Sequence, residues 1–235
     1  MKILITNDDG IDAPGLAALV KSVQHAIGDG IELIVVAPDR GRSECGHSVT
    51  TGRPLAVKAV RPQWFQTDGT PVDCVRAGLG VLAQGVDAVI SGVNAGANLG
   101  VDLHVSGTYA AAREAAISGV PALALSHYRR PDVPATWDHV PRWTHSTICE
   151  FVQRIGRSNA APLLWNVNLP AIDPATDQPA RVWCDVDWEP MVRKAFHRES
   201  EIHFESDFHA RPRKPGLDIE QCFAGAITIS EITPH

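Results

Sequence analysis

Two adjacent carboxylates near the start of the chain, Asp8 and Asp9, are the residues that point most directly to chemistry. They follow a short apolar run and precede Gly10, whose conformational freedom lets the chain turn so that both carboxylates reach one cation. A tight turn followed by a helix N-cap would use the same residues without any function. The position directly after a buried strand favours the metal anchor over the plain turn.

A second polar loop, residues 38–47, places a hydroxyl between two guanidinium groups. Ser43 is a candidate metal ligand, and Arg40 or Arg42 is a candidate phosphate contact because a guanidinium matches the geometry of phosphate oxygens. Ordinary surface arginines in a turn would give the same sequence.

A third loop, residues 91–108, offers amide carbonyls from Asn94 and Asn98 with little side-chain bulk around them. It lacks both the Lys-Ser/Thr ending of a P-loop and the G-x-G-x-x-G fingerprint of dinucleotide-binding proteins. Ser106, Gly107 and Thr108 then open a predicted helix, where backbone N–H groups and the helix dipole favour a phosphate. Helix capping alone would also explain Ser106 and Thr108.

Together these loops supply an all-oxygen ligand set of two carboxylates, a hydroxyl and an amide carbonyl. Oxygen ligands suit hard ions such as Mg²⁺ or Mn²⁺ better than Zn²⁺, whose protein sites usually include His or Cys. We expect one divalent cation at this set. One of the two carboxylates would also orient an attacking water or accept its proton. The predicted metal ligands are Asp8, Asp9, Ser43 and Asn94, and the predicted catalytic residues are Asp8 and Asp9.

Alternating apolar runs and helical periodicities must position these loops. Short apolar runs predict strands, and apolar residues at helical spacing predict helices. Alternation of the two predicts an α/β protein with a doubly wound, mostly parallel sheet and helices on both faces, whose polar loops meet at the carboxyl ends of the strands. The predicted strands are 3–6, 32–37, 88–91, 122–126 and 163–167, and the predicted helices 16–27, 72–82, 108–118 and 139–155.

The pattern changes after Pro170. Alternation in residues 181–186 and 201–208, several prolines and the lack of a convincing helix predict an antiparallel hairpin extension. We therefore expect a catalytic core over residues 1–170 and, over residues 171–235, a hairpin extension with a C-terminal strand that serves subunit contacts.

The net charge and the distribution of apolar residues indicate which kinds of binding partner to expect. A formal net charge of −6 argues against polymeric nucleic acid, which normally requires a clustered basic face. No apolar stretch is long enough to span a bilayer, and carboxylates arrive too early for a signal peptide, so no membrane partner and a cytoplasmic location are expected. An odd count of 5 scattered cysteines suits reduced thiols.

Five motifs in a fixed order carry a resemblance to a known family. The chain contains NDDG, then VVAPDRGRS followed by GHS, then GTPVDCV, SGVNAGANLG and SGTYAAA. Over residues 1 to 170 this order resembles the SurE family of survival-protein nucleotidases. The resemblance places the family's single divalent ion on Asp8, Asp9, Ser43 and Asn94.

The resemblance also implies a Rossmann-like core and an activity. That activity is hydrolysis of nucleoside 5′- and 3′-monophosphates, with polyphosphate in some members. It further implies a hairpin arm that builds a homodimer or homotetramer. Substrate phosphate is expected on the loop and helix start formed by Asn98, Ser106, Gly107 and Thr108.

Several positions depart from the family pattern. Glu44 and Cys45 are unusual in the second loop. Relatives usually carry Tyr or His before the serine of the SGT motif and Val after its threonine, whereas this chain has Val105 and Tyr109, with His104 one place out of register. Beyond Pro170 the resemblance fades, and relatives commonly continue into another helix.

Other interpretations remain open from the sequence. The chain could hydrolyse other small phosphate esters or polyphosphate, use a covalent aspartyl-phosphate, or serve as a non-catalytic nucleotide sensor. The alternating His203, Glu205, Asp207 and His209 could line one strand face as a second metal site. A plain solvated strand face is the favoured interpretation of these four residues.

Overall fold

The computed structural model describes residues 1–43, 45–155, 163–175 and 178–234. The elements of the first 170 residues are β1 (Lys2–Thr6), α1 (Pro14–Ile27), β2 (Glu32–Pro38), β3 (Val57–Arg61), β4 (Trp64–Thr67), α2 (Pro71–Ala77), the π-turn η1 (Gly78–Leu82), β5 (Ala88–Asn94), the 3₁₀ helix η2 (Gly100–His104), α3 (Gly107–Ile117), β6 (Ala122–His127), α4 (Val140–Arg154) and β7 (Leu164–Leu169). The remaining elements are β8 (Arg181–Trp183), β9 (Lys194–Arg198), β10 (Glu201–Glu205), α5 (Asp218–Phe223) and β11 (Ile227–Glu231).

Within these residues one large sheet has the strand order β3-β4-β2-β1-β5-β6-β7-β11-β8. The strands from β4 to β7 are parallel to their neighbours, while β3 and β11 pair antiparallel to β4 and β7. The predicted mostly parallel, doubly wound sheet is therefore confirmed. Because β1 lies between β2 and β5, its carboxyl end lies between the loops that follow those two strands.

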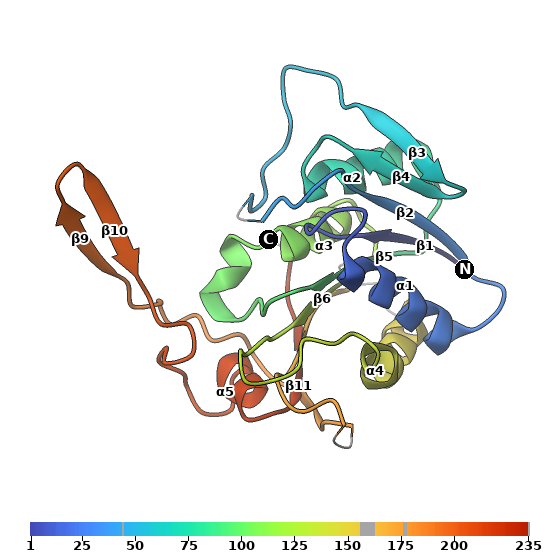
Figure 1. Ribbon diagram of the computed structural model, residues 1–235. Coiled ribbons are helices and arrows are strands. Elements are labelled where there is room, and N and C mark those ends of the chain that lie inside the picture. The colour runs from blue at the N-terminus through green and yellow to red at the C-terminus, as the bar shows by residue number, and fades with distance from the viewer. Residues whose placement is uncertain (44, 156–162, 176–177, 235) are drawn as a thin grey trace.

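Helices cover both faces of this sheet (Figure 1). On one face α1 and α4 pack against each other. Trp143 and Phe151 of α4 are fully buried in this core, and the centroid of the Phe151 ring lies 5.3 Å from that of the Trp165 ring of β7. On the other face α2 and α3 pack together over a cluster rich in alanine and valine. Burying each large apolar side chain contributes about 2 kcal/mol, so these two cores hold the strand ends in place.

Local sequence signals explain where the helices begin and end. Pro14 occupies the first turn of α1, and Leu16, Leu19 and Val23 recur on its buried face. Gly28, with φ of +78°, follows its last turn. In α2, the Thr70 side chain accepts from the Asp73 backbone while the Asp73 carboxylate accepts from the Thr70 backbone, which forms a capping box.

Several elements differ from the sequence prediction. The β3–β4 hairpin was not predicted, because β3 is exposed along its whole length and carries no apolar alternation. Helix α5 was missed because it spans only 6 residues. The segment 181–186 was expected in the hairpin extension, but its β8 portion pairs in parallel with β11 in the main sheet.

The predicted hairpin extension is present and consists of β9 and β10, which pair antiparallel and project away from the sheet in Figure 1. The division into a core at 1–170 and an extension at 171–235 stays a prediction. The structure shows that β8 and β11, both beyond residue 170, complete the main sheet.

The proposed second metal set does not gather on one strand face. Strand β10 ends at Glu205, so Asp207 and His209 lie beyond it. His209 is engaged instead with the Tyr128 hydroxyl at 2.7 Å, and Asp207 accepts from the backbone N–H of His209. In the described part of the chain, no group of three or more His, Cys, Asp or Glu side chains is arranged to hold a metal.

All five cysteines are free thiols, and Cys74 and Cys222 are buried. Burial raises the pKa of the Cys74 thiol to about 12, which keeps it protonated. Among the helices that the structure describes, none combines the length and apolar character needed to cross a membrane.

A buried histidine pair lies where β6 ends. The Nε2 atoms of His127 and His139 are 2.7 Å apart, and His127 Nδ1 lies 2.8 Å from the Tyr128 carbonyl oxygen, which assigns it as the donor. The pKa of His127 is lowered to about 3 and that of His139 to about 4, chiefly by burial and in smaller part by the nearby positive charge of Arg129.

These shifts predict acid sensitivity. Both pKa values lie below about 6.5, the value expected in the unfolded chain, so the unfolded state binds more protons as the pH falls. Their contribution to stability is complete above pH 6.5 and declines toward pH 4. Between pH 7 and pH 4.5 the free energy of unfolding should decrease less in His127→Gln than in wild type. We expect the difference between the two decreases to be about 2 kcal/mol, measured by urea denaturation. The exposed His25→Gln should keep the wild-type slope, and equal slopes for all three proteins would contradict this account.

Asp218 links three segments through backbone hydrogen bonds. Its buried carboxylate accepts from Gly100 at 2.8 Å, from Asp187 at 2.8 Å and from Ile219 at 2.9 Å. It thereby joins η2, the segment after β8 and the start of α5. Removing the carboxylate leaves three buried N–H groups without an acceptor, and each such group is costly.

We expect Asp218→Ala to lower the free energy of unfolding by about 3 kcal/mol in urea titrations. Asp185→Ala is the matched control, because Asp185 is exposed and contributes only its backbone carbonyl to this region. A loss of equal size in both variants would show that the three hydrogen bonds are not the cause.

Candidate active site

The carboxylates Asp8 and Asp9 lie directly after β1 and contact two other segments. The Thr108 hydroxyl donates to Asp8 Oδ1 at 2.5 Å, and the Ala95 backbone N–H donates to Asp9 Oδ2 at 3.2 Å. The end of β1 is thus joined to the residue after β5 and to the first turn of α3. The predicted convergence of the first and third loops is confirmed.

Gly10 shapes the turn that holds the two carboxylates. Its φ is +103°, and a Cβ at this position would lie 3.0 Å from the backbone of Arg40. The Asn7 side chain closes the turn, donating to the Gly10 carbonyl at 2.9 Å and accepting from its N–H at 3.3 Å. The alternative role as a helix cap does not apply, because Ala13 is the N-cap of α1 and no side chain caps it.

The electrostatics of the pair demand a positive charge. The pKa of Asp8 is raised to about 6, chiefly by burial and to a smaller extent by the neighbouring Asp9, while the hydrogen bond from Thr108 opposes the rise. Burial also raises the pKa of Asp9, opposed by the Ala95 N–H. Among the described residues, neither carboxylate has an ion-pair partner. A buried carboxylate beside a half-buried one, without a countercharge, is unfavourable, so the site fits a divalent cation.

The other two predicted ligands lie on neighbouring segments, Ser43 in the loop after β2 and Asn94 at the last residue of β5. Ser43 follows Arg42, whose backbone N–H donates to the Asp8 carbonyl at 2.7 Å, and the Ser43 side chain is exposed. The Asn94 amide nitrogen donates to the Gly96 carbonyl at 2.9 Å, which leaves Oδ1 as the amide atom that can coordinate a cation. The donor set is therefore chemically suited to a hard ion.

The start of α3 presses against Asp8. Ser106 is the N-cap, and its Oγ accepts from the Tyr109 N–H at 3.0 Å, so the capping role considered from the sequence is confirmed. A Cβ on Gly107 would lie 2.9 Å from both the Cβ and the Oδ2 of Asp8. The first N–H groups of a helix lack intrahelical partners, so the first turn of α3 presents them beside the carboxylate pair.

Asn98 is held by the ends of β6 and β7. Its backbone N–H donates to Asn168 Oδ1 at 2.9 Å, and its amide nitrogen donates to the Ser126 hydroxyl at 2.7 Å. The Asn98 carbonyl accepts from the amides of both Asn166 and Asn168. These contacts fix its place at the sheet edge, while its role in binding phosphate stays a prediction.

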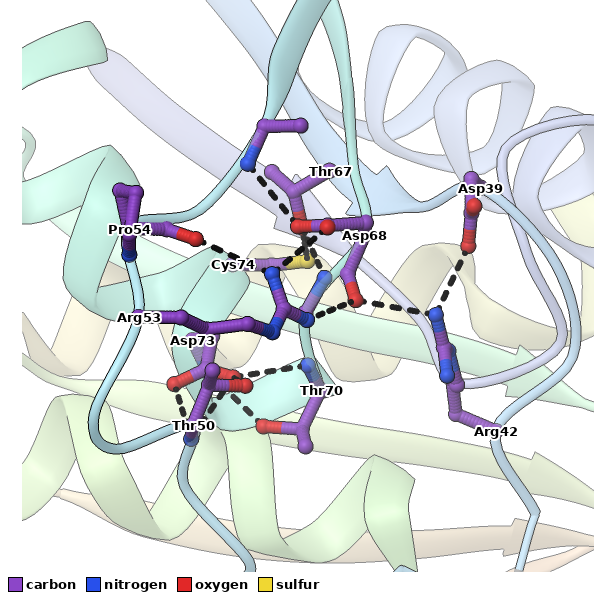
Figure 2. Close-up of polar contacts among 12 residues, drawn as sticks. Asp39, Arg42, Thr50, Arg53, Pro54, Thr67, Asp68, Thr70, Asp73 and Cys74 are labelled. Atoms are coloured by element: carbon purple, nitrogen blue, oxygen red, sulfur yellow. Dashed lines mark hydrogen bonds and ion pairs between the residues drawn. The ribbon is translucent and has the colours of Figure 1, made fainter.

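A network that sequence reasoning missed supports the loop that carries Ser43. Figure 2 shows Arg42 donating to the Asp39 carboxylate and to the Asp68 carbonyl, both at 3.0 Å. In the same view the Asp73 carboxylate faces Thr50, which donates to it through its hydroxyl at 2.6 Å. The Thr70-x-x-Asp73 spacing of a capping box was the available signal. Glu44, one of the unusual residues of this loop, lies outside the described residues.

A second set of hydrogen bonds holds the end of this loop against α3. Arg113 Nε donates to His47 Nδ1 at 3.1 Å, so His47 carries its proton on Nε2, which lies 2.8 Å from Glu114. Arg76 donates to the other oxygen of Glu114 at 2.6 Å. Burial raises the pKa of Glu114, but the hydrogen bonds from Arg76 and His47 outweigh it and hold that pKa below its usual range.

Comparisons with known proteins agree with this architecture. Residues 3–196 match the family described as Survival protein SurE. The 5′-nucleotidase SurE of Paramagnetospirillum magneticum is 37% identical over 241 residues, covering 99% of this chain and 89% of that protein. A Nostoc protein named provisionally as a 5′-nucleotidase is 39% identical over 236 residues, covering 99% of each chain.

The fold comparison gives the same answer. The crystal structure of the SurE protein from Aquifex aeolicus superposes with a TM-score of 0.82 at 25% sequence identity. The superposition covers 100% of this chain and 94% of that chain. The resemblance seen in the ordered motifs is confirmed over most of the sequence, and the chain belongs to the SurE family of survival proteins.

Proposed function

We propose that this chain is a divalent-metal-dependent phosphomonoesterase that hydrolyses nucleoside 5′- and 3′-monophosphates to nucleoside and phosphate. The observation that carries the proposal is the carboxylate pair of buried Asp8 and half-buried Asp9. Among the described residues the pair lacks an ion-pair partner, and Asp8 lies against the first turn of α3. Relatives named 5′-nucleotidase SurE support the choice of nucleotide substrates.

The proposed cofactor is one Mg²⁺ or Mn²⁺ ion per subunit, held by Asp8, Asp9, Ser43 and Asn94. When bound, the ion supplies positive charge that stabilises the negative charge developing on the phosphoryl oxygens. This choice of ion follows from the oxygen donors of the four side chains, which suit hard cations.

Side chains and backbone groups of the chain have the remaining roles in the proposed reaction. Asp8 or Asp9 orients the attacking water and accepts its proton, and the Thr108 hydroxyl fixes the orientation of Asp8 through its hydrogen bond. Phosphate oxygens rest on the N–H groups of Gly107 and Thr108 at the start of α3, with Ser106 and Asn98 as further polar contacts. The five free thiols suit a reducing compartment, and we place the protein in the cytoplasm.

The first test measures phosphate release from AMP. We expect Asp9→Asn to lower kcat/KM by about 100-fold or more, because one of the two charges that hold the cation is lost. Asp12→Asn is the matched control, since Asp12 is an exposed carboxylate in the same loop. Chelator should abolish the wild-type rate, and Mg²⁺ or Mn²⁺ should restore it.

Several outcomes would contradict the proposal. Equal wild-type rates with and without chelator would remove the metal from the reaction. Binding of AMP without turnover at any metal concentration would identify a nucleotide sensor. Faster release from polyphosphate or other phosphate esters than from AMP would change the substrate, and a trapped phosphoryl-enzyme would replace the water attack with an aspartyl-phosphate route.

We also propose that the hairpin arm, β9 and β10, contacts a second copy of the chain in a homodimer or homotetramer. Ile202 and Phe204 are 64% and 73% exposed and lie on the same face of β10. Exposed apolar side chains on a projecting hairpin are typical of a subunit contact.

Phe204→Asp is expected to shift the sedimentation coefficient toward that of a monomer, because a charge would be buried in the contact. His203→Asp places the same charge on the opposite face of the same strand and should leave the assembly unchanged. A monomeric wild-type protein, or equal effects of the two substitutions, would contradict the proposed contact.

A further inference from the structure

An aromatic cavity of about 450 Å³ opens beside the first turn of α3. Its walls include His104, Tyr109 and Trp188, together with Arg113 and Ile232. The rings of His104 and Trp188 are 5.4 Å apart between centroids and inclined by 40°. The Arg113 guanidinium lies 5.8 Å from the centre of the Tyr109 ring.

The cavity lies close to the residues expected to hold phosphate. His104 comes two residues before Ser106, and Tyr109 directly follows Thr108. Consecutive Cα atoms are about 3.8 Å apart, so these cavity residues lie within about 8 Å of the helix start along the backbone. One side of the first turn of α3 contacts Asp8 through Thr108, and Tyr109 lines the cavity.

The loop that carries Ser43 borders the same region. The Gly46 N–H donates to the Val105 carbonyl at 3.2 Å, and Arg113 donates to His47 at 3.1 Å. The start of α3 and this loop therefore contribute residues both to the candidate active site and to the border of the cavity. None of its lining residues belongs to the oxygen set around Asp8, so its chemistry is recognition rather than bond breaking.

The aromatic and guanidinium side chains that line the cavity suit a planar, heteroaromatic ligand. Aromatic faces and a guanidinium stack on flat rings, and stacking on protein aromatics contributes substantially to nucleobase binding. The volume lies in the range of small-molecule sites. Trp188 is 50% exposed, so part of this large apolar side chain is accessible to a ligand.

We propose that this cavity binds the base of the nucleoside monophosphate, with Trp188 and Tyr109 as specificity-determining residues. This inference rests on the proposed function, because the phosphate of the same substrate would occupy the start of α3. A purine offers a larger stacking face than a pyrimidine, so the cavity favours AMP and GMP over CMP and UMP.

The experiment compares Trp188→Ala with wild type on two substrates, AMP and ribose 5-phosphate, which share the phosphate ester and differ by the base. The KM for AMP should rise about tenfold, in line with the loss of one stacking contact, while values for ribose 5-phosphate stay within about twofold. Trp188→Phe keeps an aromatic ring and should recover most of the affinity for AMP. Trp183→Ala is the matched control, because Trp183 is similarly exposed at 44% and lies against Trp165 instead.

Equilibrium dialysis with adenosine separates this inference from the proposed activity, because binding of the nucleoside needs neither metal nor turnover. Adenosine bound by wild type and lost in Trp188→Ala supports the cavity even if AMP is not hydrolysed. Hydrolysis of AMP with an unchanged KM in Trp188→Ala would overturn the base site and leave the nucleotidase activity standing. Equal losses for AMP and ribose 5-phosphate would also overturn it.

Discussion

The structure depends on two adjacent carboxylates at the end of strand β1, one buried and one half-buried. Asp8 and Asp9 reside in an environment that raises both pKa values, and the hydrogen bonds from Thr108 and Ala95 only partly oppose the effect of burial. Folding brings like charges together there, so this region destabilises the apo chain relative to a neutral one. In the function proposed above, a bound divalent cation would offset this unfavourable contribution. The arrangement that weakens the fold is therefore also the one suited to such an ion.

Rigid elements are needed to hold such a site. Strand β1 has β2 and β5 as parallel neighbours on its two sides, and helix packing covers both faces of the sheet. The register between β5 and β6 shifts between Gly92 and Asn94, which marks a bulge at the end of β5, whose last residue is Asn94. Because a Cβ on Gly92 would lie 2.1 Å from the Leu125 carbonyl, this close approach requires glycine. The strand end is therefore shaped by backbone constraints as well as by side-chain burial.

Much of this could be predicted because buried strands and amphipathic helices leave strong periodic patterns. The runs around Ile3, Val35 and Ile90 placed the parallel strands, and strand order then fixed which loops meet. The β3–β4 hairpin and α5 escaped prediction because short or exposed elements bury too little to impose a pattern. Arg42, Asp73 and Glu114 make hydrogen bonds to residues 23 to 67 positions away in the sequence. Neither composition nor periodicity predicts such pairings. Their geometry depends on tertiary packing, which only the folded chain shows.

Val105 and Tyr109, which depart from the family pattern, lie on either side of the residues that open α3. Ser106, Gly107 and Thr108 are retained, and two of them contact Asp8 or cap the helix, so their identities are constrained by the site itself. The positions on either side differ from the usual pattern: Val105 is 54% exposed, whereas Tyr109 is only 4% exposed and lines the aromatic cavity. A substitution on these flanks changes the lining of the cavity and leaves the contacts of Ser106 and Thr108 in place. In the functions proposed above, substrate preference can therefore vary beside a constant set of oxygen ligands, because the first turn of α3 contacts Asp8 through Thr108 and lines the cavity through Tyr109.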